Sequence, residues 1–274
     1  MSVPGPMRWR VIEEAPVDGF RNMAVDEALL ESCAGGAEGF PCLRLYGFRP
    51  PCLSLGFSQE HARAVDLAFC RESGIDVVRR PTGGRAVLHD VELTYAVVAR
   101  YGAGPFGAGV LATYEAISRA LIAAFALLGV ESAVTEEAES DASPRGEPVC
   151  FAEPSRHEIA ARGFKIAGSA QARRRGSFLQ HGSLPIQVDV DRLAGATGLP
   201  RGAGGARRLP DLKGLAQILG RPLDPSEVAR AIRGGFERTF RGEFAAGGLA
   251  PGERERAEWL RAHRYLTAAW TFRR

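Results

Sequence analysis

Residues 79–98 read RRPTGGRAVLHDVELTYAVV, and this stretch decides the fold that the sequence predicts. The run IDVVRR at 75–80 has the β-branched composition of a short strand. The segment PTGG that follows it is a turn, because two adjacent glycines permit positive φ angles. Further strands are predicted for RAVLHD at 85–90 and for LTYAVVAR at 93–100. Short strands on both sides of a glycine turn indicate a sheet in this part of the chain.

Helical and strand-like patterns alternate on either side of this stretch. Residues 18–34 begin with an Asp cap, carry apolar residues at helical spacing and end at a glycine, which predicts a helix. The runs PCLRLYGF (41–48) and PCLSLGFSQ (51–59) are typical of short strands joined by a β-hairpin or a bend. HEIAA, FKIAGSAQAR and SFLQHGSLPI predict a three-stranded meander with turns at Arg162-Gly163 and Arg175-Gly176. Further helices are predicted at 61–73, 109–129, 211–219, 225–240 and 252–263.

Two segments have the composition of loops. EEAESDASPRGEP (136–148) is acidic and turn-rich, and GLPRGAGGARRLP (198–210) is rich in glycine and arginine. Neither separates two independent halves, and no internal repeat occurs. We therefore expect one domain over residues 1–274, with a core at about 36–245 and a helical elaboration at the carboxyl end. Strands that come first, with helices inserted and then clustered, predict an α+β fold with a mixed, largely antiparallel sheet and flanking helices.

The composition limits the classes of protein that fit. The chain has 274 residues, of which 45% are hydrophobic and 24% charged, so it can bury a sizeable core. A net charge of +3 does not demand a nucleic-acid partner. The amino terminus lacks the pattern of a signal peptide. The apolar run ALIAAFALLGV (120–130) is much shorter than the roughly 20 residues of a bilayer span. We expect a cytoplasmic protein without a membrane partner.

Cysteine and histidine patterns give no metal site. The five cysteines include no C-x-x-C pair, which is typical of reduced thiols without a disulfide framework. The five histidines lack metal-binding spacing such as H-E-x-x-H, so we expect neither a metal nor a cofactor. Among them, His157 and His181 are candidate bases for a cysteine nucleophile, although polar or turn positions are the more ordinary roles.

The glycine turn is the first candidate for a binding site. Adjacent Gly83 and Gly84 allow backbone N–H groups to approach a ligand closely. Arg79, Arg80 and Arg85 would add positive charge, and His89 and Asp90 end the following strand. From the glycine pair alone, a glycine hairpin with solvated arginines is the favoured interpretation. Neither a Walker sequence nor G-x-G-x-x-G occurs, so no nucleotide fingerprint is present.

Cys150 and Lys165 form the second candidate. Lysine occurs only at Lys165 and Lys213, while arginine supplies the rest of the 35 basic residues. An ammonium is a compact charge that can release a proton, whereas a guanidinium cannot. A nearby lysine lowers the pKa of a cysteine thiol and makes it a better nucleophile for thioesters. From spacing alone, a buried core thiol and a surface charge are the favoured interpretation of the two positions.

Two other patterns have ordinary explanations. The run ARRRG at 172–176 is typical of a solvated hairpin tip, with docking of an acidic protein as the minority alternative. Trp259, Tyr265 and Trp270 occur at helix-like spacing, which favours packing over the stacking of nucleic-acid bases.

Taken together, the block at 79–98 and the block PSRHEIAARGFKIAGSAQARRRGSFLQHGSLPI at 154–186 resemble the biotin/lipoate protein ligase superfamily. Within it, the chain is most similar to the LipM-type octanoyltransferases, from NMAVDEALLE near the amino end to AAWTFRR at the carboxyl end. The resemblance implies the catalytic-domain fold of that superfamily. It also implies an enzyme that moves an octanoyl group from acyl carrier protein to a lysine of the glycine-cleavage H protein, or of a similar lipoyl domain, in lipoate biosynthesis.

The resemblance assigns roles to individual residues. Cys150 matches the cysteine that forms the acyl thioester, and Lys165 matches the lysine that lowers the pKa of that cysteine. The glycine block matches the segment that shapes the acyl pocket. The substrate-binding positions implied in this way are Arg79, Gly83, Gly84, His89, Gly168, Ser169 and Ala170.

Three alternatives follow from the same likeness. ATP-dependent lipoate or octanoate ligases usually carry a third glycine where this chain has Arg85, and a Gly-Asn pair where it has Val91-Glu92. Since such ligases share the lysine, Cys150 is the residue that separates transferase from ligase. An octanoyl amidotransferase acting between lipoyl domains also uses a cysteine, but its glycine block differs. The last alternative is a non-catalytic binding or regulatory module, which would retain its ligand without turnover.

Overall fold

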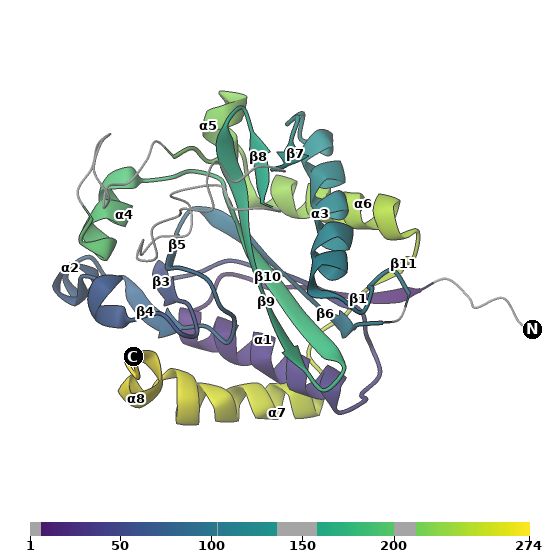
Figure 1. Ribbon diagram of the computed structural model, residues 1–274, viewed down its shortest axis with the longest axis horizontal. Helices are drawn as coiled ribbons and strands as arrows, with labels where there is room; N and C mark the ends of the chain where they lie inside the picture. Colours follow the sequence, from purple (N-terminus) through teal and green to yellow (C-terminus); the bar gives the residue numbers. More distant parts are fainter. Residues whose placement is uncertain (1–6, 103, 136–157, 200–211) are drawn as a thin grey trace, which may run out of the picture.

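The computed structural model describes residues 7–102, 104–135, 158–199 and 212–274. Within them, the main sheet has eight strands in the order β11-β1-β2-β6-β10-β9-β8-β7 (Figure 1). β1 pairs in parallel with β2 and β11, and every other pairing in this sheet is antiparallel. The predicted mixed, largely antiparallel sheet is confirmed. Its strands are β1 (Arg8–Glu13), β2 (Cys42–Tyr46), β6 (Glu92–Arg100), β7 (Ala133–Val134), β8 (Ile159–Ala161), β9 (Phe164–Arg174), β10 (Ser177–Pro185) and β11 (Glu243–Ala246).

A second, three-stranded sheet contains the glycine turn. β3 (Cys52–Leu55) lies between β4 (Asp76–Arg79), which is parallel to it, and β5 (Val87–His89), which is antiparallel. The hairpin considered for the two PCL runs is therefore wrong, and the bend is right, because β2 and β3 belong to different sheets. Leu53 and Leu55 of β3 pack into a small apolar cluster of their own.

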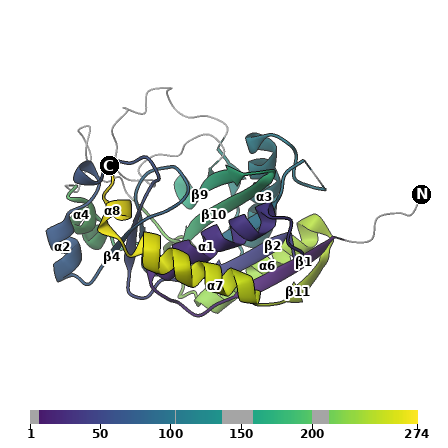
Figure 2. The ribbon, with the colours of Figure 1, turned by 90° about the horizontal axis from the view of Figure 1, so that it is seen from below.

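Helices cover both faces of the main sheet. α1 (Gly19–Ala34) and α7 (Pro251–Leu260) lie together on one face, and α3 (Val110–Leu127) packs with α6 (Pro225–Phe240) on the other (Figure 2). Successive side chains of β6 point to opposite faces of the sheet, so this strand contributes to the core on both faces. Its residues Leu93, Tyr95, Val97 and Ala99 enter the cluster with α3 and α6, whereas Ala96 and Val98 enter the cluster with α1 and α7.

Most of the helices predicted from the sequence are confirmed within a few residues. The segment predicted as one helix at 61–73 divides into a 3₁₀ turn and a short helix. α7 continues as one π-helical turn. The sequence patterns did not predict α4, α8, β1, β7 or β11. The short helical segments are η1 (His61–Arg63), α2 (Leu67–Glu72), α4 (Val190–Thr197), α5 (Leu215–Leu219), η2 (Arg261–Tyr265) and α8 (Ala268–Thr271).

α3 is a core helix. Among the described residues it is the one helix long and apolar enough, by composition, to cross a membrane. Its residues Ile117, Leu121 and Phe125 are buried in the cluster that joins the sheet to α6. This packing agrees with the buried helix face predicted from the apolar run in the sequence.

The predicted meander of β8, β9 and β10 is confirmed, and it positions the site. At both turns an arginine adopts positive φ (50° at Arg162 and 43° at Arg175), and a glycine with φ above 80° follows it. This is the backbone of a tight two-residue hairpin. The resulting register places Ala170 opposite His181 and Gly168 opposite Ser183.

Candidate functional site

Two neighbouring pockets lie where the two sheets meet. The first, here called the His181 pocket, contains about 410 Å³ of space between atoms, part of which is open to solvent. The second, here called the Lys165 pocket, contains about 550 Å³ of such space, also partly open to solvent. The His181 pocket is lined by Met23, Tyr46, Ser54, Arg80, Gly84, Val87, His89, Thr94, Gly168–Ala170 and His181–Ser183. The Lys165 pocket is lined by Leu88, Asp90–Glu92, Lys165, Pro185, Gln187–Asp189, Leu193, Leu212 and Lys213.

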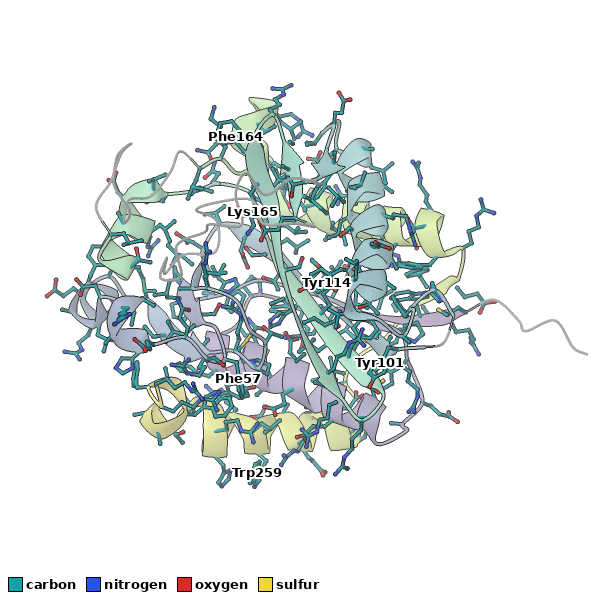
Figure 3. All side chains as sticks on the ribbon, in the orientation of Figure 1. Phe57, Tyr101, Tyr114, Phe164, Lys165 and Trp259 are labelled. Carbon is teal, nitrogen blue, oxygen red and sulfur yellow. The ribbon has the colours of Figure 1, made fainter. Side chains whose placement is uncertain are left out.

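The same strands line both pockets. On β9, Lys165 faces the Lys165 pocket and Gly168–Ala170 face the His181 pocket. On β10, Pro185 lines the Lys165 pocket and His181–Ser183 line the His181 pocket. Three to five residues of strand span roughly 10–17 Å. The two pockets therefore follow one another along β9 and β10, and Figure 3 shows Lys165 near one end of this long hairpin.

The glycine turn forms one wall of the His181 pocket and is held by Arg80. The guanidinium of Arg80 is buried and donates to the carbonyl oxygens of Gly83 and Arg85, each at 2.7 Å, and to that of Ser54 at 2.9 Å. Gly84 has a φ of 90°, which favours glycine. A Cβ on Gly56 would lie 1.8 Å from the carbonyl oxygen of Gly84, so the turn also packs tightly against the end of β3. The hydrogen bonds of Arg80 and the close packing of Gly56 against Gly84 together fix this wall.

Arg79 lies elsewhere. It is fully buried, and its guanidinium donates to the carbonyl oxygens of Gly56, Gln59 and Thr271 at 2.7, 2.7 and 2.9 Å. Burial and the neighbouring cations lower its pKa to about 10. Among the residues that the structure describes, Arg79 is absent from the lining of both pockets, and its neighbour Arg80 is present. The guanidinium of Arg79 thus joins the carboxyl-terminal segment to the small sheet.

His89 is held on both sides of its ring. Its Nδ1 lies 2.8 Å from an oxygen of Glu92, and its Nε2 lies 2.8 Å from Oγ of Ser54. A carboxylate can only accept, so Nδ1 donates to Glu92, and Nε2 forms its hydrogen bond with the hydroxyl of Ser54. The ring also stacks on Phe48, with the ring centroids 4.0 Å apart. Glu92 accepts further hydrogen bonds from Thr94 and Ser183. His89 is therefore a fixed element of the pocket wall.

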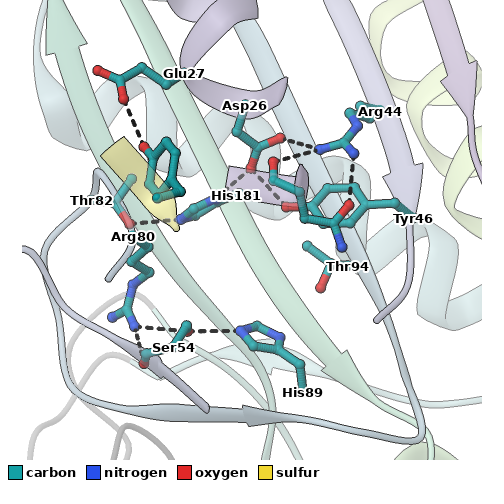
Figure 4. A network of polar contacts seen from close by, with 12 residues as sticks. Asp26, Glu27, Arg44, Tyr46, Ser54, Arg80, Thr82, His89, Thr94 and His181 are labelled. Atoms are coloured by element: carbon teal, nitrogen blue, oxygen red, sulfur yellow. Dashed lines mark hydrogen bonds and ion pairs between the residues drawn. The ribbon is translucent and has the colours of Figure 1, made fainter. Parts of the chain in front are cut away.

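His181 is the centre of a second buried network, shown in Figure 4. Its Nδ1 donates to Oδ2 of Asp26 at 2.8 Å, and its Nε2 accepts from the hydroxyl of Thr82 at 2.7 Å. Burial lowers the pKa of His181 in spite of Asp26. Burial would raise the pKa of Asp26, but Arg44, His181 and Tyr46 together bring it below its ordinary value. Asp26 is therefore ionised and His181 neutral near pH 7.

Gly168, Ser169 and Ala170 form the strand wall opposite the glycine turn. The hydroxyl groups of Ser169 and Tyr95 lie 2.7 Å apart, and the amide of Gln180 donates to the hydroxyl of Tyr95 at 3.2 Å. Burial raises the pKa of Tyr95 to about 12, so this phenol stays neutral. A Cβ on Gly182 would lie 2.6 Å from a ring carbon of Tyr95 and 2.8 Å from the carbonyl oxygen of Gly168. The space beside this wall depends on the absence of a side chain at residue 182.

Lys165 is buried in the wall of the Lys165 pocket. Its side chain is 1% exposed, and its Nζ lies 2.5 Å from Oε1 of Glu158. The other lysine, Lys213, lines the same pocket, with its Nζ 4.5 Å from the centre of the Phe164 ring. Both lysines of the chain therefore lie at one pocket. Sequence reasoning did not predict a role for Glu158. This residue directly precedes β8, the strand that pairs with β9 at Lys165.

Cys150, the expected nucleophile, lies outside the described residues, as do His157 and the predicted loop at 136–148. The four cysteines that the structure describes are buried. Burial raises the pKa of Cys42 to about 12 and that of Cys70 to about 11, and it also raises the pKa of Cys33 and Cys52. These four have the properties of inert core thiols. Within the described part of the chain, no group of three or more candidate ligands could hold a metal ion.

The arginine run and the terminal aromatic residues do not belong to the pockets. At the hairpin tip, Arg174 pairs with Glu31 at 2.6 Å, and the guanidinium of Arg173 lies 4.4 Å from the centre of the Tyr101 ring. Tyr265 is fully buried, as the packing interpretation predicts, whereas Trp259 is 47% exposed. Trp259 stacks on the outer surface with His263.

Sequence reasoning missed Ser54, Met23 and Tyr46 as residues of the His181 pocket, whereas it named Arg80 among the arginines beside the glycine turn. Ser54 lies on β3, which adjoins that turn, and the turn is a signal that could have found it. Met23 and Tyr46 carry no comparable signal, because apolar and aromatic residues at such positions are typical of any core.

The fold is that of the lipoate-protein ligases. Protein Ta0514 from T. acidophilum with bound lipoic acid superposes with a TM-score of 0.79 at 24% identity, covering 97% of this chain and 100% of that one. Lipoate-protein ligase A bound with ATP gives the same TM-score and identity, covering 97% and 99% of the two chains. At this identity, the likeness establishes the fold alone.

Sequence comparison identifies the family. Residues 18–237 match the model of the lipoyl protein ligase A/B catalytic domain. Octanoyltransferase LipM of Moorella thermoacetica is 37% identical over 270 residues, covering 97% of this chain and 98% of the relative. Octanoyltransferase LipM of Symbiobacterium thermophilum is 38% identical over 273 residues, with the same coverage. The chain belongs to the family of lipoyl protein ligase A/B catalytic domains, and it is an acyltransferase.

Proposed function

We propose that this enzyme transfers an octanoyl group from acyl carrier protein to a lysine of the glycine-cleavage H protein, or of a similar lipoyl domain, in lipoate biosynthesis. Cys150 carries the group as a thioester, and no metal or cofactor takes part. The reaction takes place in the cytoplasm, without a membrane or nucleic-acid partner. The observation that carries this proposal is the likeness, over nearly the whole chain, to proteins named Octanoyltransferase LipM.

The chemistry has two half-reactions. The thiolate of Cys150 attacks the donor thioester, and the thiol of the carrier leaves. The neutral amine of the acceptor lysine then attacks the Cys150 thioester, which forms an amide and releases the thiolate. The first exchange is close to balance because it replaces one thioester with another. Formation of the amide makes the second step favourable.

Lys165 supplies the positive charge in this scheme. An ammonium in a wall sheltered from water stabilises a nearby anion more strongly than it would in bulk water. The low exposure of its side chain supports this role. We propose that it lowers the pKa of the Cys150 thiol and stabilises the oxyanion that forms when the thioester is attacked.

The His181 pocket is the proposed site for the acyl chain. Gly84, His89, Gly168, Ser169 and Ala170 all line it. These are five of the seven positions that the sequence resemblance implied for substrate binding, and the absence of side chains at its glycines leaves room for a chain. Each buried methylene adds about 0.8 kcal/mol, so longer chains gain affinity until their end reaches a wall.

One assay tests the proposal. Octanoyl carrier protein and the apo H protein are incubated with the enzyme, with and without ATP, and product is followed by mass spectrometry of the acceptor. We expect transfer without ATP, an octanoyl adduct on Cys150, and loss of both in Cys150→Ala with folding intact. Transfer by the Cys150→Ala variant would exclude the thioester route. Transfer from free octanoate that needs ATP would identify a ligase.

Further donors and acceptors separate the remaining alternatives. Transfer that requires an octanoylated lipoyl domain as donor, in place of the carrier protein, would identify an amidotransferase. Retention of octanoate without turnover under every condition would identify a binding protein.

A further inference from the structure

Glu158 and Lys165 form an ion pair that is sheltered from water. Their side chains are 14% and 1% exposed, and the ammonium donates to Oε1 at 2.5 Å. The backbone of Glu158 is fixed as well, because its carbonyl oxygen accepts from the N–H of Thr135 at 2.9 Å and from the hydroxyl of Thr135 at 3.1 Å. The carboxylate is therefore held in place beside Lys165 and is not a mobile surface charge.

A β-bulge lies beside the two residues. Ala160 on β8 pairs with Lys165 on β9, but its neighbour Ile159 pairs with Ala167, so the register shifts by one residue. Bulges of this kind change the direction of the side chains beside them. The bulge lies directly at Lys165, on the strand that continues into the His181 pocket.

The carboxylates that line the Lys165 pocket have partners of their own. Asp90 pairs with the guanidinium of Arg192 at 2.9 Å, and Asp189 accepts from the backbone N–H of Arg192 at 3.0 Å as the cap of α4. Glu92 accepts from His89 at 2.8 Å and from two hydroxyl groups. Glu158, which is outside this lining set, is the carboxylate that the described structure pairs with Lys165.

The chemistry of the family makes this pairing consequential. The enzyme acylates a lysine amine, and Lys165 is itself a lysine amine in the wall of the candidate site. Burial favours the neutral form of an amine, whereas an adjacent carboxylate favours the ammonium. A neutral amine has a free electron pair and can attack an acyl group, but an ammonium has none.

We propose that Glu158 is a positioning residue that keeps Lys165 protonated and thereby prevents the enzyme from acylating itself. Without this carboxylate, the nitrogen of Lys165 would attack the carbonyl carbon of the bound thioester. The C–N bond would form, the C–S bond would break, and the amine proton would pass to the departing thiolate. The resulting amide could not be reversed by thiol exchange. This inference rests on the proposed function for one point, the identity of the thioester that supplies the acyl group.

The first test uses the acyl donor. Glu158→Gln and the wild-type enzyme are incubated with octanoyl carrier protein, digested and mapped by mass spectrometry. Because the chain has only two lysines, acylation of Lys165 is resolved from that of Lys213. We expect octanoyl-Lys165 to accumulate in Glu158→Gln while activity decays, with no accumulation in the wild type. Glu237→Gln, which breaks an exposed ion pair with Arg233, is the matched control and should behave as the wild type. Unmodified Lys165 in a folded Glu158→Gln would overturn the proposal.

The second test does not depend on the proposed function. Native protein is labelled with an N-hydroxysuccinimide ester at several pH values, and the rate at Lys165 is divided by the rate at Lys213. We expect the ratio at neutral pH to rise at least about tenfold in Glu158→Gln, since loss of the anion favours the neutral amine. In Glu158→Asp, which keeps a carboxylate on a shorter side chain, the ratio should lie between those of the wild type and Glu158→Gln.

The two tests fail independently. An unchanged ratio in both Glu158 variants would overturn the proposal even if octanoyl transfer is observed. If Glu158→Gln does not fold, Glu158→Asp alone decides, and a ratio equal to that of the wild type counts against the proposal. A raised ratio with no octanoyl transfer from any donor would instead refute the proposed function and leave the charge role of Glu158 intact.

Discussion

Asp26 on α1 and His181 on β10 are 155 residues apart in the sequence, yet their side chains meet at 2.8 Å. The hydrogen bond joins the helix on one face of the sheet to the strand that lines the His181 pocket. Arg44 and Tyr46 bind the same carboxylate at 2.7 Å each, so Asp26 is surrounded by donors (Figure 4). Because both partners are buried, their protonation is linked to folding.

This linkage predicts a loss of stability in mild acid. Burial lowers the pKa of His181 below its usual value of about 6.5, so the unfolded chain takes up this proton first. Stability is therefore lost as the pH falls below about 6.5. The lowered pKa of Asp26 has the same sign, but its effect begins only below about pH 4. Thermal unfolding of the wild type should show a falling Tm between pH 7 and pH 5.

His181→Asn is the variant that checks this prediction. Asparagine can still donate to Asp26 but does not titrate, so the Tm should change less between pH 7 and pH 5. At pH 7 the variant should lose about 1 kcal/mol, the usual net contribution of one hydrogen bond. Substitution of the exposed His263, also to asparagine, should leave the pH dependence of the wild type. An equally steep pH dependence in His181→Asn would show that another group is responsible.

Arg79→Lys separates a binding role from a structural one. A lysine cannot reach the carbonyl oxygens of Gly56, Gln59 and Thr271 together, so buried acceptors would lose their donors. We expect unfolding to become easier by roughly 2–3 kcal/mol, as for a buried charged hydrogen bond. The KM of the folded variant should stay close to that of the wild type. A large rise in KM without loss of stability would instead support the substrate-binding role expected from the sequence.

Gly182→Ala tests the space beside the strand wall. The added Cβ would meet Tyr95 and Gly168 at less than 3 Å, so it would displace the strand wall of the His181 pocket. Overpacking of this kind costs about 1–3 kcal/mol. We expect kcat/KM to fall more for octanoyl than for shorter acyl donors, measured with a series of carrier-bound chains.

The matched control for this variant is Gly252→Ala on α7. A Cβ at this exposed helical position meets no atom within 4 Å, so the protein should gain about 0.5–1 kcal/mol of stability. A uniform loss of activity with every chain length in Gly182→Ala would indicate general distortion rather than a smaller pocket.

Local signals in the sequence predicted the elements that depend on local chemistry. Asp18 accepts from the backbone N–H of Arg21 at 2.8 Å, as an N-cap should, and α1 begins and ends where predicted. The Arg-Gly turns of the meander have the positive φ angles that the pattern requires. β11 was missed because a four-residue strand with three exposed residues carries little pattern. Its pairing with β1 is a contact between distant parts of the chain.

In the candidate site, too, local sequence predicts some residues, while the rest depend on contacts between distant parts of the chain. The glycine block and the segment Gly168–Ala170 are recognisable in sequence, and the structure brings them to one pocket. The choice between Arg79 and Arg80 could not be made in advance, because neighbouring residues of a strand point to opposite faces. Which face of β4 adjoins the pocket is decided by the packing of the two sheets. Likewise, Glu158 meets Lys165 beside a bulge, and no spacing rule predicts one.

Lys165→Arg examines the charge that the proposed mechanism places beside Cys150. A guanidinium keeps the positive charge but has a broader, planar head and a different reach, so it should stabilise the thiolate less well. We expect the pH profile of Cys150 alkylation by iodoacetamide, mapped by mass spectrometry, to shift to higher pH. The four buried cysteines should react slowly in every variant and provide an internal reference. Lys213→Arg is the matched control, because its ammonium lies over the ring of Phe164. If both variants keep the wild-type profile, Lys165 does not activate the thiol.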